Sequence, residues 1–158
     1  MTEGTQDQVQ ELYALLVPLA EERLIVPRAC VAEVIGFSRP VPRPGSAAWL
    51  LGTVNWSGRM LPVISFEGAC GRTQPEAGSR TRIVVFFAIG GGLEGGYYGV
   101  LTQGFPQLLR VNADALDTSD REWPDDSPVI AQPKLNSEYP LIPDLERVEQ
   151  MLQHELVS

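Results

Sequence analysis

The chain has 158 residues, of which 44% are hydrophobic and 20% charged, and its formal net charge is −8. This length predicts a single domain, and the composition is ordinary for a soluble globular protein. No segment approaches the roughly 20 apolar residues of a membrane-spanning helix, and the polar, acidic start lacks the features of a secretory signal. We therefore expect a cytoplasmic protein with no direct membrane insertion.

The charges are distributed unevenly along the chain. Eight arginines and three glutamates lie between Arg23 and Arg82, whereas the remaining residues carry four cations and seventeen acids. Basic residues scattered in this way through an acidic protein do not form a nucleic-acid footprint, so we expect no nucleic-acid partner. The arginine-rich part is either ordinary solvated surface or a cationic face for an acidic partner protein.

Short apolar runs separated by turn residues predict a strand-rich fold. Residues 1–10 are expected to form a disordered lead-in to a single domain over residues 11–157. Strands are expected at residues 12–19, 23–27, 30–37, 50–56, 59–66, 81–89, 97–104, 105–111, 129–131 and 139–142. Proline-rich residues 40–45 predict an extended connector, and residues 67–80 and 112–127 predict loops.

The central feature is a predicted β-hairpin over residues 50–66. Ser57 and Gly58 separate two apolar runs, and glycine accepts the positive φ of a two-residue turn. This turn would place Trp56 opposite Arg59, and it would leave both faces of the hairpin largely apolar, so both must be covered. The tip combines the aromatic Trp56, the cation Arg59 and the amide Asn55, which is too polar for a core and indicates a contact surface.

A glycine-rich segment could suggest a nucleotide-binding loop. Residues 90–96 contain a formal GxGxxG pattern, but the sequence that follows is typical of a strand rather than the helix that dinucleotide binding requires. We therefore interpret the segment as a hairpin loop.

A C-terminal helix is expected from Asp144. Its apolar stripe would consist of Leu145, Val148, Leu152 and Leu156, and His154 would face water.

The sequence argues against an enzyme. The only histidine is expected on the exposed face of the last helix, so no Ser/His/Asp set can form, and no pair of carboxylates stands in an apolar setting. Cys30 and Cys70 are far apart and lack a CxxC pattern, which favours reduced thiols over a zinc or catalytic site. We expect no catalytic residues, metal ligands or cofactor, and we expect a β-barrel module whose function is contact.

Residues 52–66 resemble the signature of the CheW-like coupling proteins of bacterial chemosensory systems. That family typically has a glycine, two β-prone residues, Asn-Leu-Arg-Gly, two apolar residues and Pro-Val-Ile-Asp-Leu. This chain has Gly-Thr-Val-Asn-Trp-Ser-Gly-Arg-Met-Leu-Pro-Val-Ile-Ser-Phe at the same place. Residues 31–35 and the strand around Gly99 are similar to further family motifs, so the resemblance extends over roughly residues 12–152.

The resemblance implies a mainly β fold of two intertwined SH3-like five-stranded barrels with a C-terminal helix. It also implies an adaptor that couples the regulatory domain of a CheA-type histidine kinase to the cytoplasmic tips of methyl-accepting chemoreceptors. Val31 and Glu33 would face the receptor, and Gly52, Asn55 and Gly58 would shape the contact hairpin.

The chain departs from the family pattern at three positions. Ser57 replaces the arginine before the hairpin glycine, Ser65 replaces an aspartate, and Gln103 replaces an acidic residue. We hypothesise that recognition has moved from Ser57 to Trp56 and Arg59, and that the chain belongs to the branch of type IV pilus (twitching) chemosensory systems. The alternative is a small OB-like barrel that binds a ligand or oligonucleotide. That alternative requires basic residues clustered with aromatic ones, such as Phe86, Phe87, Tyr97 and Tyr98, on adjacent strands.

Overall fold

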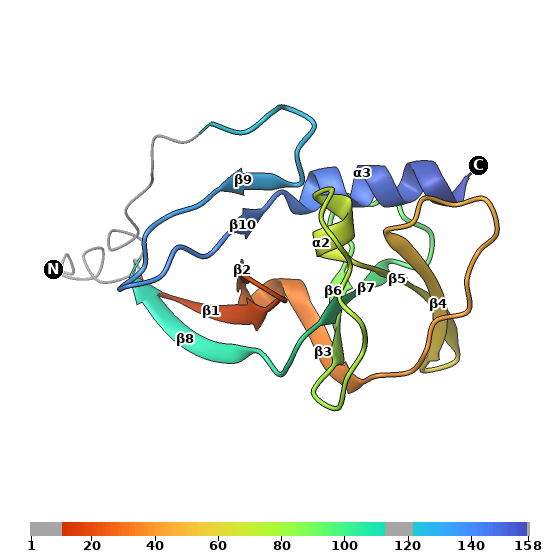
Figure 1. The fold of residues 1–158 in the computed structure, drawn as a ribbon, viewed down its shortest axis with the longest axis horizontal. Helices are drawn as coiled ribbons and strands as arrows, with labels where there is room; N and C mark the ends of the chain where they lie inside the picture. Colours follow the sequence, from red (N-terminus) through yellow and green to blue (C-terminus); the bar gives the residue numbers. More distant parts are fainter. Residues whose placement is uncertain (1–10, 113–121, 158) are drawn as a thin grey trace, which may run out of the picture.

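The computed structural model describes residues 11–112 and 122–157, and it shows a mainly β protein that ends in one helix (Figure 1). The predictions for residues 1–10 and for most of the acidic segment lie outside the described residues. The strands are β1 (Glu11–Pro18), β2 (Arg23–Pro27), β3 (Val31–Gly36), β4 (Leu50–Trp56), β5 (Arg59–Ile64), β6 (Arg82–Phe87), β7 (Tyr97–Thr102), β8 (Gln107–Asn112), β9 (Val129–Ala131) and β10 (Ile142–Pro143). The helices are η1 (Arg28–Cys30), α2 (Phe66–Ala69) and α3 (Leu145–Leu156).

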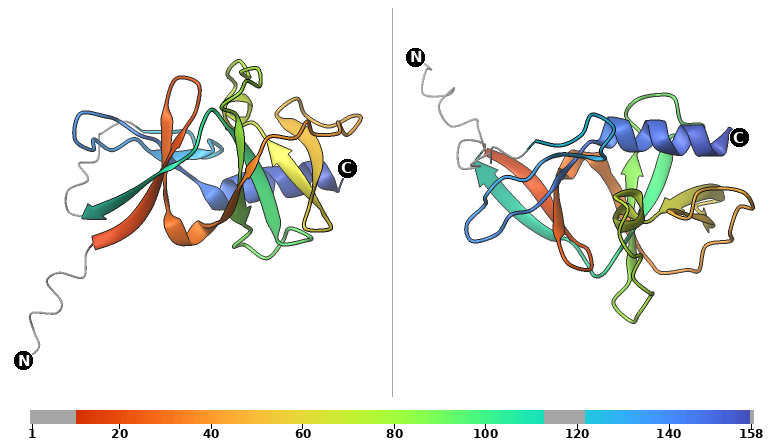
Figure 2. Two further views of the ribbon diagram at one scale, coloured as in Figure 1. Left: turned by 90° about the horizontal axis from the view of Figure 1, so that it is seen from below. Right: turned by 45° about the horizontal axis from the view of Figure 1, so that its top comes forward.

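The strands form two groups, and the chain passes from one to the other and back. The first strand group contains the sheet β2-β1-β8 and the pair β10-β9, and a bridge between Leu24 and Leu141 joins this sheet to the pair. The second strand group is the five-stranded sheet with the order β3-β6-β7-β5-β4. Because β1 and β2 precede the second group and β8 follows it, the two groups are intertwined, as the resemblance implies. They occupy opposite ends of the molecule (Figures 1 and 2).

Three clusters of apolar side chains hold this arrangement together. The largest lies between the two strand groups and α3, and it contains Val17, Phe86 and Leu152. A second cluster fills the second strand group around Val63 and Ile83, and a third fills the first strand group around Ile25 and Val111. The expectation that both faces of the central hairpin are covered holds only in part. Val54 packs in one cluster and Leu50 in another. Near the tip, however, Met60 is 67% exposed.

The central hairpin has the predicted register from the tip inwards. Trp56 pairs with Arg59, and the ladder continues to Gly52 opposite Val63. Beyond that point a β-bulge places Leu50, rather than Leu51, opposite Ile64. The bulge lies where residues 40–45 cross the hairpin, because the backbone of Val41 exchanges two hydrogen bonds with Thr53.

Helix α3 begins where the sequence predicts. The side chain of its N-cap, Asp144, accepts a hydrogen bond from the backbone N–H of Arg147, and Val148 and Leu152 are buried.

The short helix α2 corrects the prediction for the segment after residue 66, which was expected to be a loop. Ser65 caps α2 by accepting a hydrogen bond from the backbone N–H of Gly68. Serine and aspartate are both good N-caps, so the departure at Ser65 preserves the local structure.

Two smaller predictions are also corrected. The last strand was expected at residues 139–142, but β10 begins at Ile142, and Leu141 forms the bridge to β2. Trp123 was expected in a solvated loop, yet its ring packs against the largest apolar cluster. Aromatic rings bury a large area, and here packing prevails over the acidic surroundings in sequence.

Candidate functional site

The tip of the central hairpin is a tight turn with two residues of positive φ. Ser57 has φ of 50° and Gly58 has φ of 77°. Positive φ at both central residues is the pattern of a type I′ turn, which matches the right-handed twist of the strands on either side. Serine is a non-glycine residue in this conformation, so position 57 is restricted to side chains that tolerate it.

The indole of Trp56 joins the two outer strands of the second strand group. Its N–H donates a hydrogen bond of 2.9 Å to a carboxylate oxygen of Glu33. Glu33 lies on β3 and Trp56 on β4, and these are the two edges of the sheet. The bond therefore fixes the orientation of the indole relative to both edges.

Tyr97 on β7 is the centre of an aromatic cluster next to this bond. Its ring lies 4.8 Å from that of Trp56 in an edge-on arrangement and 5.5 Å from that of Phe87. The guanidinium of Arg59 lies over the Tyr97 ring at 4.9 Å and also donates to the carbonyl oxygen of Gly95 at 3.3 Å. We call Glu33, Trp56, Arg59, Tyr97 and Phe87 the tip cluster.

The structure brings together most of the residues expected at the site. Asn55, Ser57, Gly58 and Arg59 are exposed at the tip, and Trp56 is half-buried beside them. Gly52 is separate, because it is buried under the connector at the bulge. A Cβ at Gly52 would lie 2.1 Å from the carbonyl oxygen of Val41, and its φ is 138°. Its role is therefore the close approach of two backbones.

The expectation that Val31 and Glu33 share one face is wrong. The register between β3 and β6 shifts between these two residues, so that Val31 pairs with Phe86 and Glu33 with Val85. A bulge changes which residues point to each face of a strand. Val31 consequently packs against the largest apolar cluster, whereas Glu33 bonds to Trp56.

The sequence does not identify Tyr97 and Phe87 as site residues, and it suggests both only as aromatics of an OB-like barrel. Their neighbours Phe86 and Tyr98 are buried and stacked at 5.4 Å in the core, which leaves one aromatic of each pair for the surface. The signal was the alternation itself, since adjacent residues of a strand point to opposite faces. One arginine beside these rings is not the basic cluster that the OB-like alternative requires.

Helix α3 also carries a buried carboxylate that the sequence does not reveal. Glu149 is 5% exposed, and its two oxygens accept hydrogen bonds of 2.8 and 2.7 Å from the backbone N–H groups of Ile89 and Gly90. It thereby anchors the glycine-rich loop, whose amides hold a carboxylate of the protein itself. This geometry agrees with the rejection of a dinucleotide site there.

The cysteines do not form a reactive pair. Both are free thiols. Burial, with a smaller contribution from Glu67, raises the pKa of Cys70 from its usual 9.0 to about 11. Burial, and then Glu149, also raise the pKa of Cys30. A raised pKa disfavours the nucleophilic thiolate. Within residues 11–112 and 122–157, no group of three His, Cys, Asp or Glu side chains is placed to hold a metal ion.

The described part of the chain contains no helix with the length and apolar character needed to cross a bilayer.

The comparison with family models matches residues 13–152 to the CheW-like domain. Among solved structures, the fold is similar to that of the scaffolding protein TtCheW from Thermoanaerobacter tengcongensis, with a TM-score of 0.70 and 17% sequence identity over 84% of this chain and 88% of that one. No curated protein matches the chain.

Proposed function

Because the chain belongs to the CheW-like domain family, we propose that it is a cytoplasmic, non-enzymatic adaptor in chemosensory signalling. In this proposal it couples the regulatory domain of a CheA-type histidine kinase to the cytoplasmic tips of methyl-accepting chemoreceptors. TtCheW, whose fold is similar, is a scaffolding protein, which supports the same class of function.

The observation that carries the proposal is the tip cluster. Aromatic and arginine side chains dominate the energetics of protein interfaces when their orientation is fixed in advance. Trp56 is held by Glu33 on one side and Tyr97 on the other. The guanidinium of Arg59 donates a hydrogen bond to Gly95 through one of its nitrogens, and its other N–H groups can serve a carboxylate of the partner.

The tip cluster also explains how the chain could recognise a partner without the family arginine at position 57. Serine there offers one hydroxyl, whereas arginine offers a bidentate, charge-assisted contact. Arg59 supplies a cation two positions further along the chain, over the ring of Tyr97. We propose that this altered tip suits the branch of type IV pilus chemosensory systems, in which partners would be matched to Trp56 and Arg59.

The test measures binding by calorimetry to the kinase regulatory domain and to a receptor-tip fragment encoded in the same genome, each titrated separately. Trp56→Ala and Arg59→Ala should each weaken binding to at least one partner by about 10-fold or more. Trp56→Phe keeps an aromatic ring and should lose less. Arg80→Ala is the matched control, because Arg80 is exposed and lies outside the tip cluster.

The outcomes separate the parts of the proposal. If wild-type protein binds both partners and the two alanine variants bind them equally well, the adaptor function stands and the tip is not the contact. If wild-type protein binds neither partner, the coupling function itself is wrong. Ser57→Arg shows whether the family contact can be restored, since a gain in affinity means that position 57 still faces the partner.

A further inference from the structure

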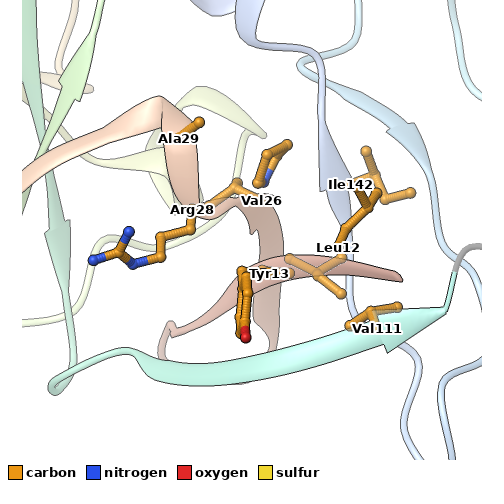
Figure 3. A pocket seen from close by; sticks show the side chains of 10 residues that line it. Leu12, Tyr13, Val26, Arg28, Ala29, Val111 and Ile142 are labelled. Carbon is orange, nitrogen blue, oxygen red and sulfur yellow. The ribbon is translucent and has the colours of Figure 1, made fainter. Parts of the chain in front are cut away.

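A second candidate site lies in the first strand group, away from the tip cluster. A cavity of about 480 Å3 opens beside β1, β2 and η1, with Val111 of β8 and Ile142 of β10 completing its wall (Figure 3). Its volume lies within the range of small-molecule sites. Leu12 and Tyr13 on its rim are 56% and 54% exposed, so both side chains are accessible to a ligand.

The wall of this cavity is almost entirely hydrocarbon. Ala14, Ile25 and Val111 are buried members of the apolar cluster of the first strand group, and they form part of its wall. Leu12 and Ile142 continue this surface towards the opening. A ligand that fills the cavity must therefore have an apolar body, since a polar group placed here would lose its water without gaining a hydrogen bond.

One charged side chain lines the cavity. Figure 3 shows the guanidinium of Arg28 directed away from Leu12, Val111 and Ile142, so the charge and the hydrocarbon surface lie at opposite ends. Among the residues that the structure describes, no carboxylate forms an ion pair with Arg28. The cavity thus has one apolar end and one cationic end.

We infer that this cavity binds an aliphatic carboxylate, with the hydrocarbon chain against Leu12, Val111 and Ile142 and the carboxylate at Arg28. The apolar wall selects the chain by burial, and the guanidinium selects the anionic head by a charge-assisted contact. This inference goes beyond the adaptor function and does not depend on it, because the cavity shares no residue with the tip cluster.

The test uses the full chain and two amphiphiles with the same tail and opposite charge, both kept below their critical micelle concentrations. Calorimetry should show that dodecanoate binds at least about 10-fold more tightly than dodecyltrimethylammonium. Arg28→Gln should remove most of this difference, whereas Arg39→Gln, which changes an arginine outside the cavity, should leave it unchanged. Ala29→Phe places a large ring at an exposed position of the cavity wall and should abolish binding of both amphiphiles.

Circular dichroism establishes whether Ala29→Phe remains folded, and Arg28→Gln decides the role of the charge in either case. Equal affinity for the two amphiphiles, or unchanged affinity of Arg28→Gln for dodecanoate, would overturn the inference. Absence of dodecanoate binding to wild-type protein would also overturn it. If Ala29→Phe instead weakened binding to the kinase domain or receptor tip, with no dodecanoate binding by the wild type, the cavity would receive a protein segment and the inference would be wrong.

Discussion

Glu33 and Trp56 are 23 positions apart in the sequence, and a hydrogen bond of 2.9 Å joins their side chains. They lie on β3 and β4, the two edge strands of the five-stranded sheet that forms the second strand group. A side-chain bond between the two edges restricts how the sheet can open at that end. Glu33 therefore helps to hold the indole of Trp56 in its observed orientation.

This relationship predicts a coupling between the two side chains. Glu33→Ala should lower the free energy of unfolding by about 0.5–1.5 kcal/mol, the net value of a hydrogen bond at a partly exposed site. Trp56→Phe removes the donor and keeps a ring, so Glu33→Ala made in that background should cost less. Urea denaturation of the two single variants and the double variant measures the difference. Strictly additive effects would mean that the bond contributes nothing to stability.

The strands and the hairpin register could be predicted from the sequence because local patterns determine them. Alternation of apolar residues identifies strands, and Ser57-Gly58 fixes the pairing of Trp56 with Arg59. The cap of α3 at Asp144 is likewise a local signal. These predictions did not require knowledge of which strands meet.

The tip cluster could be predicted only in part, because its members come from separate strands. Trp56 and Arg59 were identified from the hairpin alone, whereas the contacts of Tyr97 and Phe87 depend on the order β6-β7-β5. The bulge in β3 places Val31 and Glu33 on opposite faces, although the strand pattern assigned both to one face. A one-residue shift of this kind leaves no clear mark in such a pattern. Glu149 was missed because a buried carboxylate depends on backbone donors that only the tertiary fold brings near it.

Gly52 should be intolerant of substitution because of the connector above it. A Cβ there would meet the carbonyl oxygen of Val41 at 2.1 Å, and the backbone conformation is unfavourable for other residues. We expect Gly52→Ala to lower the free energy of unfolding by about 2 kcal/mol or more. Gly36→Ala is the control, since Gly36 also lies in a strand and nothing is within 4 Å of a Cβ there. Equal thermal midpoints for the two variants would show that the connector moves aside without cost.

Glu149 should contribute to stability through the two amide groups that it satisfies. Glu149→Gln leaves one acceptor oxygen, so a partly buried backbone N–H of Ile89 or Gly90 loses its partner. A fully buried donor without a partner costs about 1–3 kcal/mol, so this partly buried one should cost about 1 kcal/mol, which chemical denaturation can measure. Glu146→Gln, an exposed position on the same helix, should change stability by less than about 0.5 kcal/mol. A loss no larger than that of the control would exclude an anchoring role for Glu149.

Ser57 should be replaceable by a residue that fits the turn better. Its φ of 50° is unfavourable for serine and well tolerated by asparagine, which is common at this position of a type I′ turn. Ser57→Asn should raise the free energy of unfolding by up to about 1 kcal/mol, part of the roughly 1–2 kcal/mol that the left-handed conformation costs most residues, and urea denaturation measures this gain. Ser57→Val, which introduces a β-branched side chain at positive φ, should lower it. The opposite order of stabilities would mean that the turn adopts another conformation in solution.

Cys70 should be a slow thiol whose protonation makes stability depend on pH. Burial is the main cause that raises its pKa to about 11, so at pH 8 its thiolate fraction should be on the order of 100-fold below that of a thiol with the usual pKa. In the Cys30→Ala background, a thiol reagent should therefore react slowly with native protein and rapidly in urea. The unfolded thiol ionises near pH 9 and the folded one near pH 11, so this contribution to stability is complete below pH 9 and is lost as the pH rises to 11. Cys70→Ala should remove that loss between pH 9 and 11. A native reaction rate equal to that of a small free thiol would contradict the burial of this group.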